Sequence, residues 1–256
     1  MPRTGIILRS AILTGLAGLL FSVVSVSAPA GDAGKIILGA GGGFGSYAMG
    51  TINRQYVDLV NSGPGFFDGR MENGPNYSGM IGFFLSDNVS VEVSVSYLGS
   101  RIEKSSEVIV TDEFGSETGT SETYRQLASR LIAPELRLIR HWNVGPTELS
   151  LGAGLTRGFG WLNYRSEARV ADASVPVVGE FNRIGAGLGW SATAGVSRSL
   201  LKYFSLELRA GYRRFVTEYL TNEDGVLWEV DLSGQPERID LDFSGPYLVA
   251  ILALKL

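Results

Sequence analysis

Apolar and polar side chains alternate without interruption along residues 88–99 (NVSVEVSVSYLG). One face of this stretch carries serines and a single glutamate, and the other face carries Val89, Val91, Val93, Val95 and Tyr97. Period-two alternation with many β-branched residues predicts a strand with one polar and one apolar face. The alternation alone leaves open whether the valines face a protein core or lipid.

The same alternation recurs along the chain and predicts eight strands, at residues 35–45, 76–85, 88–99, 124–141, 147–164, 184–197, 204–216 and 244–256. It changes phase near Pro134, which predicts a bulge or bend there. Short and long connections alternate strictly. The short ones are residues 86–88, 142–146 and 200–203, and the long polar ones are residues 46–75, 104–123, 165–183 and 219–241.

An even number of strands with alternating short and long connections predicts an all-β fold, an eight-stranded antiparallel up-and-down transmembrane β-barrel with short periplasmic turns and long extracellular loops. The alternative is an exported soluble β-sandwich or lipocalin-like barrel. The polar faces consist of Gly, Ser, Thr and charged residues, which cannot form a dry core. The apolar faces would form a large exposed patch on a soluble protein. A closed barrel, in contrast, satisfies its backbone hydrogen bonds within lipid.

The barrel prediction assigns each strand residue to the lipid or to the lumen. The expected lipid-facing residues include Val89, Val91, Val93, Val95, Leu149, Leu151, Leu188, Val196, Leu206, Leu208, Leu252 and Leu254. An eight-stranded barrel is only wide enough to be filled by its own side chains, so charges inside it must pair. The expected ion-pair network consists of Glu92, Glu135, Arg137, Glu148, Glu207, Arg209, Arg213 and Lys255. Arg209 and Arg213 are the candidate partners of Glu92, and a proton or ion pathway through these residues is the alternative.

Aromatic residues near the strand ends predict two interfacial belts, because amphipathic rings are stable at headgroup level. The expected members are Tyr97, Trp161, Tyr164 and Tyr219 at the extracellular side, and Trp142, Tyr203 and Phe204 at the periplasmic side. Arg157 shares the phase of the lipid-facing residues of its strand. Since arginine costs about 2–4 kcal/mol at the bilayer midplane, we expect it near the outer rim, or turned inward by a bulge.

Residues 1–30 have the features of a secretory signal peptide. Arg3 and Arg9 precede an apolar run that ends in Ala28-Pro29-Ala30, which fits a basic region, an apolar region and a small-residue exit. Cleavage is expected after Ala30, leaving residues 31–256 as the barrel domain, and an uncleaved membrane anchor is the alternative. The absence of cysteine excludes disulfides and a lipoprotein acylation site.

The sequence offers little catalytic chemistry. His141 is the only histidine, and we expect it at the periplasmic interface beside Trp142, without a serine placed as a nucleophile. The glycine-rich segment 39–48 alternates with apolar residues, which indicates a lumen face rather than a nucleotide loop. We therefore expect no enzymatic activity, no cofactor and no metal site. The net charge of −4 argues against a nucleic-acid partner.

The long connections are acidic. Residues 103–122 hold six acidic residues against Lys104, and residues 218–242 hold eight against Arg238. They are expected to be solvated, or to bind lipopolysaccharide through divalent cations or to attract cationic partners. Residues 222–225 (NEDG) predict a tight tip, with the last two strands continuing beyond the bilayer as a hairpin. Residues 52–60 have helical spacing and predict a short helix over the outer mouth.

With these strands, and with Leu248, Ala250, Leu252, Leu254 and Leu256 alternating at the end, residues 35–256 resemble the small outer-membrane β-barrels of the OmpA-transmembrane-domain, OmpX, OmpW and opacity-protein type. The terminal residue is Leu, where that family commonly ends in Phe. The resemblance implies location in the cell outer membrane and contact with outer-membrane lipid and lipopolysaccharide. It also implies recognition of the last strand by the barrel-insertion machinery, and an extracellular partner at the loops. It favours a non-enzymatic surface protein, and the alternatives are a narrow pore for small or hydrophobic compounds and a lipid-modifying hydrolase.

Overall fold

The structure is a computed structural model that describes residues 33–61, 66–111, 117–170, 177–231 and 236–256. The predicted signal peptide and its cleavage site at Ala30 lie outside these residues. No helix within the described part of the chain is long and apolar enough to cross a bilayer.

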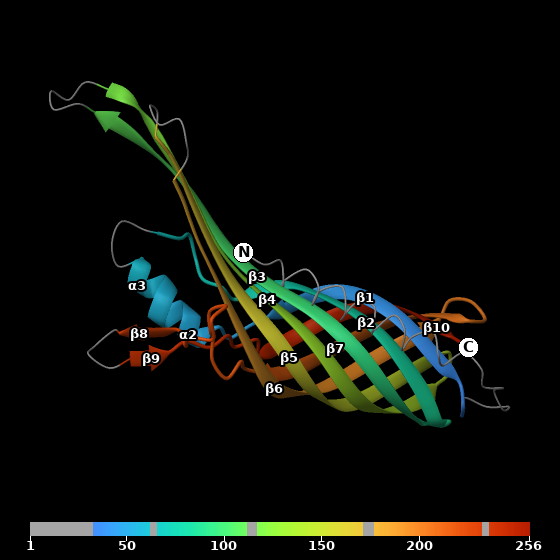
Figure 1. Cartoon of the computed structure of the whole chain (residues 1–256). Coiled ribbons are helices and arrows are strands. Elements are labelled where there is room, and N and C mark those ends of the chain that lie inside the picture. Colours follow the sequence, from blue (N-terminus) through green and yellow to red (C-terminus); the bar gives the residue numbers. More distant parts are fainter. Residues whose placement is uncertain (1–32, 62–65, 112–116, 171–176, 232–235) are drawn as a thin grey trace.

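Eight strands close into one antiparallel barrel (Figure 1), in the order β1-β10-β7-β6-β5-β4-β3-β2. Their bounds are β1 Ile36–Ser46, β2 Asn73–Ser86, β3 Val89–Thr111, β4 Glu117–Val144, β5 Thr147–Val170, β6 Val177–Ser199, β7 Phe204–Phe215 and β10 Gly245–Lys255. The first and last strands complete the ring by pairing from Ile37↔Lys255 to Gly45↔Tyr247. Closure leaves the wall without a free edge, and it confirms the predicted fold and strand number.

Strands β3 to β6 run far beyond the ring (Figure 1). Pairing between β3 and β4 continues to Thr111↔Glu117, and pairing between β5 and β6 continues to Ala168↔Val177. We call residues 100–111, 117–129, 163–170 and 177–183 the extension. The prediction of long loops at residues 104–123 and 165–183 is therefore wrong for most of both segments. These residues are polar because they lie outside the lipid, but they retain the strand ladder.

The predicted bulge at Pro134 is absent. The pairs Ile132↔Phe159 and Glu135↔Thr156 belong to one unbroken register between β4 and β5. Pro134 points outward, and its carbonyl accepts a 2.8 Å hydrogen bond from the Thr156 hydroxyl. The apparent change of phase arises because the inward row of β4 itself contains apolar residues, Leu131, Ala133 and Ile139, all buried.

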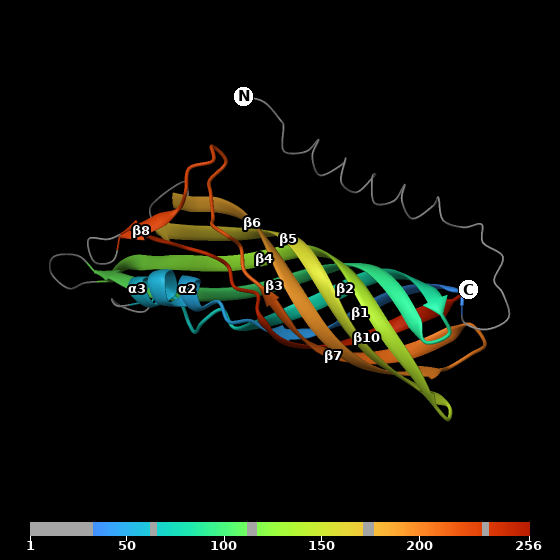
Figure 2. The ribbon, with the colours of Figure 1, turned by 90° about the horizontal axis from the view of Figure 1, so that it is seen from below.

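The chain between β1 and β2 covers the extracellular mouth with three short helical turns, α2 Gly50–Ile52, η1 Asn53–Val57 and α3 Asp58–Val60, which confirms the predicted short helix. The Asn53 side chain ties this cap to the following segment, because its Nδ2 donates to the Met71 carbonyl at 3.0 Å and its Oδ1 accepts from the Met71 N–H at 2.9 Å. The C-terminus lies at the opposite end of the barrel (Figure 2).

The segment between β7 and β10 is irregular. The tight turn predicted at residues 222–225 is present, since the Asn222 side chain accepts hydrogen bonds from the N–H groups of Asp224 and Val226, and Gly225 has a φ of 79°. The predicted β7–β10 hairpin beyond the bilayer is wrong. β7 ends at Phe215, and the segment forms isolated bridges and a separate pair, β8 Glu229–Asp231 and β9 Pro236–Arg238.

Candidate functional site

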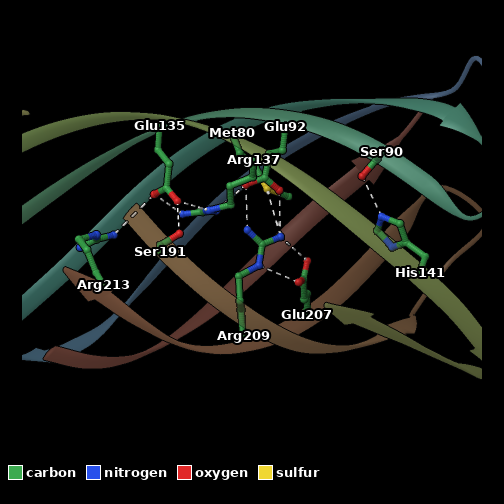
Figure 3. Close-up of polar contacts among 10 residues, drawn as sticks. All are labelled: Met80, Ser90, Glu92, Glu135, Arg137, His141, Ser191, Glu207, Arg209 and Arg213. Carbon is green, nitrogen blue, oxygen red and sulfur yellow. Dashed lines mark hydrogen bonds and ion pairs between the residues drawn. The ribbon is translucent and has the colours of Figure 1, made fainter. Parts of the chain in front are cut away.

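The lumen is crossed at mid-height by a buried ion-pair network (Figure 3). Arg137 donates to both oxygens of Glu135, at 2.8 Å each, and to Glu92 at 2.6 Å. Arg209 donates to both oxygens of Glu92, at 2.8 and 2.9 Å, and to Glu207 at 2.9 Å. Glu92 thus joins two arginines that lie on separate strands. Such bidentate, charge-assisted bonds are the strongest class of protein hydrogen bond.

We call Glu92, Glu135, Arg137, Glu207, Arg209 and Arg213 the central network. Its three acidic and three basic side chains balance in formal charge, and all six residues are buried. Arg213 is the least well paired, because its nearest carboxylate oxygen, on Glu135, is 4.0 Å away and its guanidinium lies over the ring of Tyr247. Of the two partners predicted for Glu92, the structure therefore brings Arg209 to it and not Arg213. Arg137 is a further partner.

The side chains of this network occupy space that is free because position 154 is a glycine. A Cβ added at Gly154 would lie 2.6 Å from Cγ of Arg137 and closer still to a carboxylate oxygen of Glu135. The glycines on the inward rows therefore act as predicted, as the lining of a narrow lumen in which only some strands can carry long side chains.

A second polar cluster lies nearer the periplasmic end. The Nε2 atom of His141 is 2.8 Å from the Ser90 hydroxyl, and its Nδ1 atom is 2.9 Å from Glu148. Lys255 donates to the other oxygen of Glu148 at 2.6 Å. The predictions that His141 is interfacial and lacks a neighbouring serine are both wrong. His141 shares the inward phase of Glu135 and Arg137, which is the signal that could have placed it in the lumen.

The order hydroxyl, imidazole, carboxylate resembles that of a serine hydrolase, but the surroundings do not support acyl transfer. Ser90 is 2% exposed, and the adjoining cavity of about 20 Å³ has room for about one water molecule. Ser90 lies inside the wall, on β3 between the paired strands β2 and β4, so an acyl substrate has no open approach to its hydroxyl. The cluster instead satisfies buried polar groups inside the wall.

Most of the outer surface of the ring is apolar. Leu155 and Leu188, which lie on the outward rows of β5 and β6, are 73% and 72% exposed. All twelve residues predicted to face lipid lie on the outward row of their own strand. A soluble protein would not leave so large a continuous apolar surface in water, and a closed ring with a polar interior needs no hydrogen bonds from lipid. The chain is an eight-stranded transmembrane β-barrel of the outer-membrane type.

Solved outer-membrane barrels are similar to this barrel in fold. They include OprG from Pseudomonas aeruginosa (11% identity, covering 88% of this chain and 97% of that chain, TM-score 0.46). Neisserial surface protein A is 12% identical (87% and 96% covered, TM-score 0.40), and the outer membrane protease OmpT from Escherichia coli is 10% identical (91% and 98% covered, TM-score 0.35). No protein-family model and no curated protein matches the chain. At these identities the similarity concerns the fold alone.

The barrel places the predicted interfacial aromatics on two sides of the wall. Tyr97, Trp142, Trp161, Tyr203, Phe204 and Tyr219 lie on the outer surface. The prediction is wrong for Tyr164, which shares the inward phase of Leu162 and packs between Phe66 and Phe181. The outer surface also carries exposed rings that the prediction missed, Phe44, Tyr77, Trp190 and Tyr212.

Arg157 is exposed on the outward row of β5. The register between β5 and β6 is continuous on both sides of Arg157↔Leu188, so the alternative of a bulge that turns this residue inward is wrong. Its side chain faces the surroundings of the barrel.

The extracellular mouth is blocked by an apolar cluster. It is formed by the cap, the inner face of the extension and the segment before β10. Its fully buried members include Met49, Ile52 and Val57 of the cap, Leu127 and Leu162 of the strands, and Leu220, Ile239 and Leu241. Above them Tyr56 contacts the rings of Phe181 and Trp228, and burial raises the pKa of the Tyr56 phenol to about 12. We call this set the mouth cluster.

Proposed function

We propose that this barrel is a closed, non-enzymatic surface protein of the outer membrane, with its function in the extension and the cap rather than in its lumen. The observation that supports this most directly is closure at two levels, by the central network and by the mouth cluster. A pathway through the barrel would have to break the ion pairs of Glu92 with Arg137 and Arg209 and also expose the apolar mouth cluster to water. Both steps are costly.

The extension has the character of an interaction surface. It carries exposed acidic residues on strands that stand clear of the lipid, among them Glu103, Glu107 and Glu122. Part of this charge is locally neutralised, because Glu103 lies 3.4 Å from Arg101 and accepts a 3.0 Å hydrogen bond from Tyr124. The proposal thus assigns adhesion, envelope integrity or contact with the environment to this end of the molecule.

Wild-type protein reconstituted into planar bilayers is expected to show no stable single-channel conductance, since the ion pairs and the mouth cluster leave no continuous water path. The control is an outer-membrane porin of known conductance, reconstituted by the same protocol. A steady unitary conductance of the wild-type protein would contradict the closed lumen and favour the alternative, a narrow pore for small or hydrophobic compounds.

Replacing His141 by alanine is expected to leave the acyl composition of lipid A and of the phospholipids unchanged in cells that express the protein. The same change should lower the free energy of unfolding by about 1–3 kcal/mol, because Ser90 and Glu148 lose a buried partner. Lipid mass spectrometry and urea unfolding measure the two effects. If wild-type protein alters the lipids, and His141→Ala and Ser90→Ala both abolish that alteration, the non-enzymatic assignment is wrong.

A further inference from the structure

The outward rows of β4, β5, β6 and β7 carry charge of only one sign. From the periplasmic turns up to the level of Trp161, the described charged side chains on these rows are five arginines: Arg130, Arg140, Arg157, Arg198 and Arg214. The outward rows of β10, β1 and β2 carry none. The acidic residues of the same wall segments point into the lumen. The barrel therefore presents a cationic sector and an uncharged sector to the membrane.

Three of these arginines lie at the extracellular end, next to exposed aromatic rings. Arg214 pairs across strands with Trp190, whose ring contacts that of Tyr212 at 6.0 Å between centroids. Arg157 pairs with Leu188, which lies two residues nearer the extracellular end of β6 than Trp190. Arg130 pairs with Trp161. Aromatic rings of this kind lie at headgroup level. The three guanidinium groups therefore lie at the depth of the phosphate groups of the outer leaflet.

None of these three arginines has an ion-pair partner among the described residues, whereas Arg101 on the extension lies 3.4 Å from Glu103 and the lumen arginine Arg137 is bound at 2.6 Å. The outward-facing acidic residue nearest to Arg214 in sequence is Glu218. It follows the end of β7, and its backbone N–H donates to the Ala186 carbonyl. A guanidinium fork matches phosphate oxygens geometrically and is weakly hydrated. Arginines left unpaired at the headgroup level of one sector are therefore available to an anionic lipid.

We propose that Arg130, Arg157 and Arg214 form a binding surface for the phosphate groups of an outer-leaflet glycolipid, on the β4–β7 side of the barrel. The ligand is identified by its chemistry as a multiply phosphorylated amphiphile whose chains lie on the leucines of the wall below. The surface is separate from the lumen and from the acidic extension. Binding there does not depend on whether the lumen conducts.

The test is the binding of diphosphorylated lipid A to the full-length barrel in detergent, measured by native mass spectrometry. The triple variant Arg130→Gln, Arg157→Gln, Arg214→Gln is expected to bind at least about tenfold more weakly than wild type. Glu218→Gln, which removes a charge from the same face, is the matched control and should bind at least as well as wild type. Heat-modifiable gel migration reports that each variant is folded. Arg157→Gln alone, expected to weaken binding by a smaller factor, replaces the triple variant if the latter does not fold.

Two results with lipid A itself would overturn the proposal. One is equal affinity of wild type and the arginine variants for diphosphorylated lipid A. The other is equal affinity of wild type for lipid A and its dephosphorylated form, which would assign binding to the acyl chains. Phosphatidylglycerol vesicles provide the second source of lipid phosphate, and binding to them as tight as to lipid A would exclude the glycolipid as the specific ligand.

Discussion

Replacing Arg137 by methionine is expected to lower the free energy of unfolding of the refolded barrel by about 3–5 kcal/mol, the usual cost of breaking a buried ion pair from one side. Arg137 holds two carboxylates at once, Glu92 at 2.6 Å and Glu135 at 2.8 Å. Methionine keeps most of the volume but leaves Glu135 with only Ser191 and the distant Arg213. The effect is therefore electrostatic rather than a loss of packing.

Arg213→Met is the matched control. Arg213 is 1% exposed, but its closest carboxylate contact is 4.0 Å, so its removal should change the unfolding free energy by about 1 kcal/mol or less. Urea unfolding in detergent micelles, followed by tryptophan fluorescence, measures both variants. Equal losses for the two variants would show that the central network contributes through net charge and not through its bidentate pairs.

Val93→Arg is expected to impair insertion and to destabilise the barrel by about 2–4 kcal/mol, the cost of arginine on the lipid face near the bilayer midplane. Val93 is 49% exposed and pairs with Ile81 on β2 and Leu136 on β4, so it lies within an apolar patch of the outer wall. No neighbouring group in that patch can accept the guanidinium protons.

Ser94→Ala, one residue along the same strand, changes the opposite face. Ser94 is buried toward the lumen, and its hydroxyl has no hydrogen-bond partner among the described residues, so the substitution should be close to neutral. Heat-modifiable migration of the outer-membrane fraction and urea unfolding compare the two variants. Normal insertion of Val93→Arg would mean that the inner and outer faces of the barrel are assigned the wrong way round.

The wall could be predicted from the sequence because its signal is local. Each strand repeats a period of two, and the side on which Val93 or Leu188 lies follows from that period alone. The extension could not be predicted in the same way. Outside lipid neither face needs to be apolar, so segments such as residues 104–111 lose the alternation while keeping the ladder. From sequence alone, such a polar segment has the same pattern as a solvated loop.

Predicting the site required knowing which strands pair and which strands face each other across the lumen. The inward phase of Glu92 predicts that it needs a cationic partner. Which arginine meets it, Arg209 or Arg213, depends on how β3 and β7 face each other across the lumen of the closed ring. Ser90 and His141 are 51 positions apart and meet because β3 and β4 pair. The phase of Arg157 alone predicts that it faces outward, but its proximity to Arg130 and Arg214 follows only from the register of four strands.

The extension also has a mechanical consequence. β4 is a single strand of 28 residues, whereas β10 has 11, so one strand runs from the extension down to the periplasmic rim. A hinge would absorb a pull or a twist applied by something held at the tip. A continuous twisted sheet transmits it as torque to the membrane-embedded ring, and with it to the lipids that surround that ring.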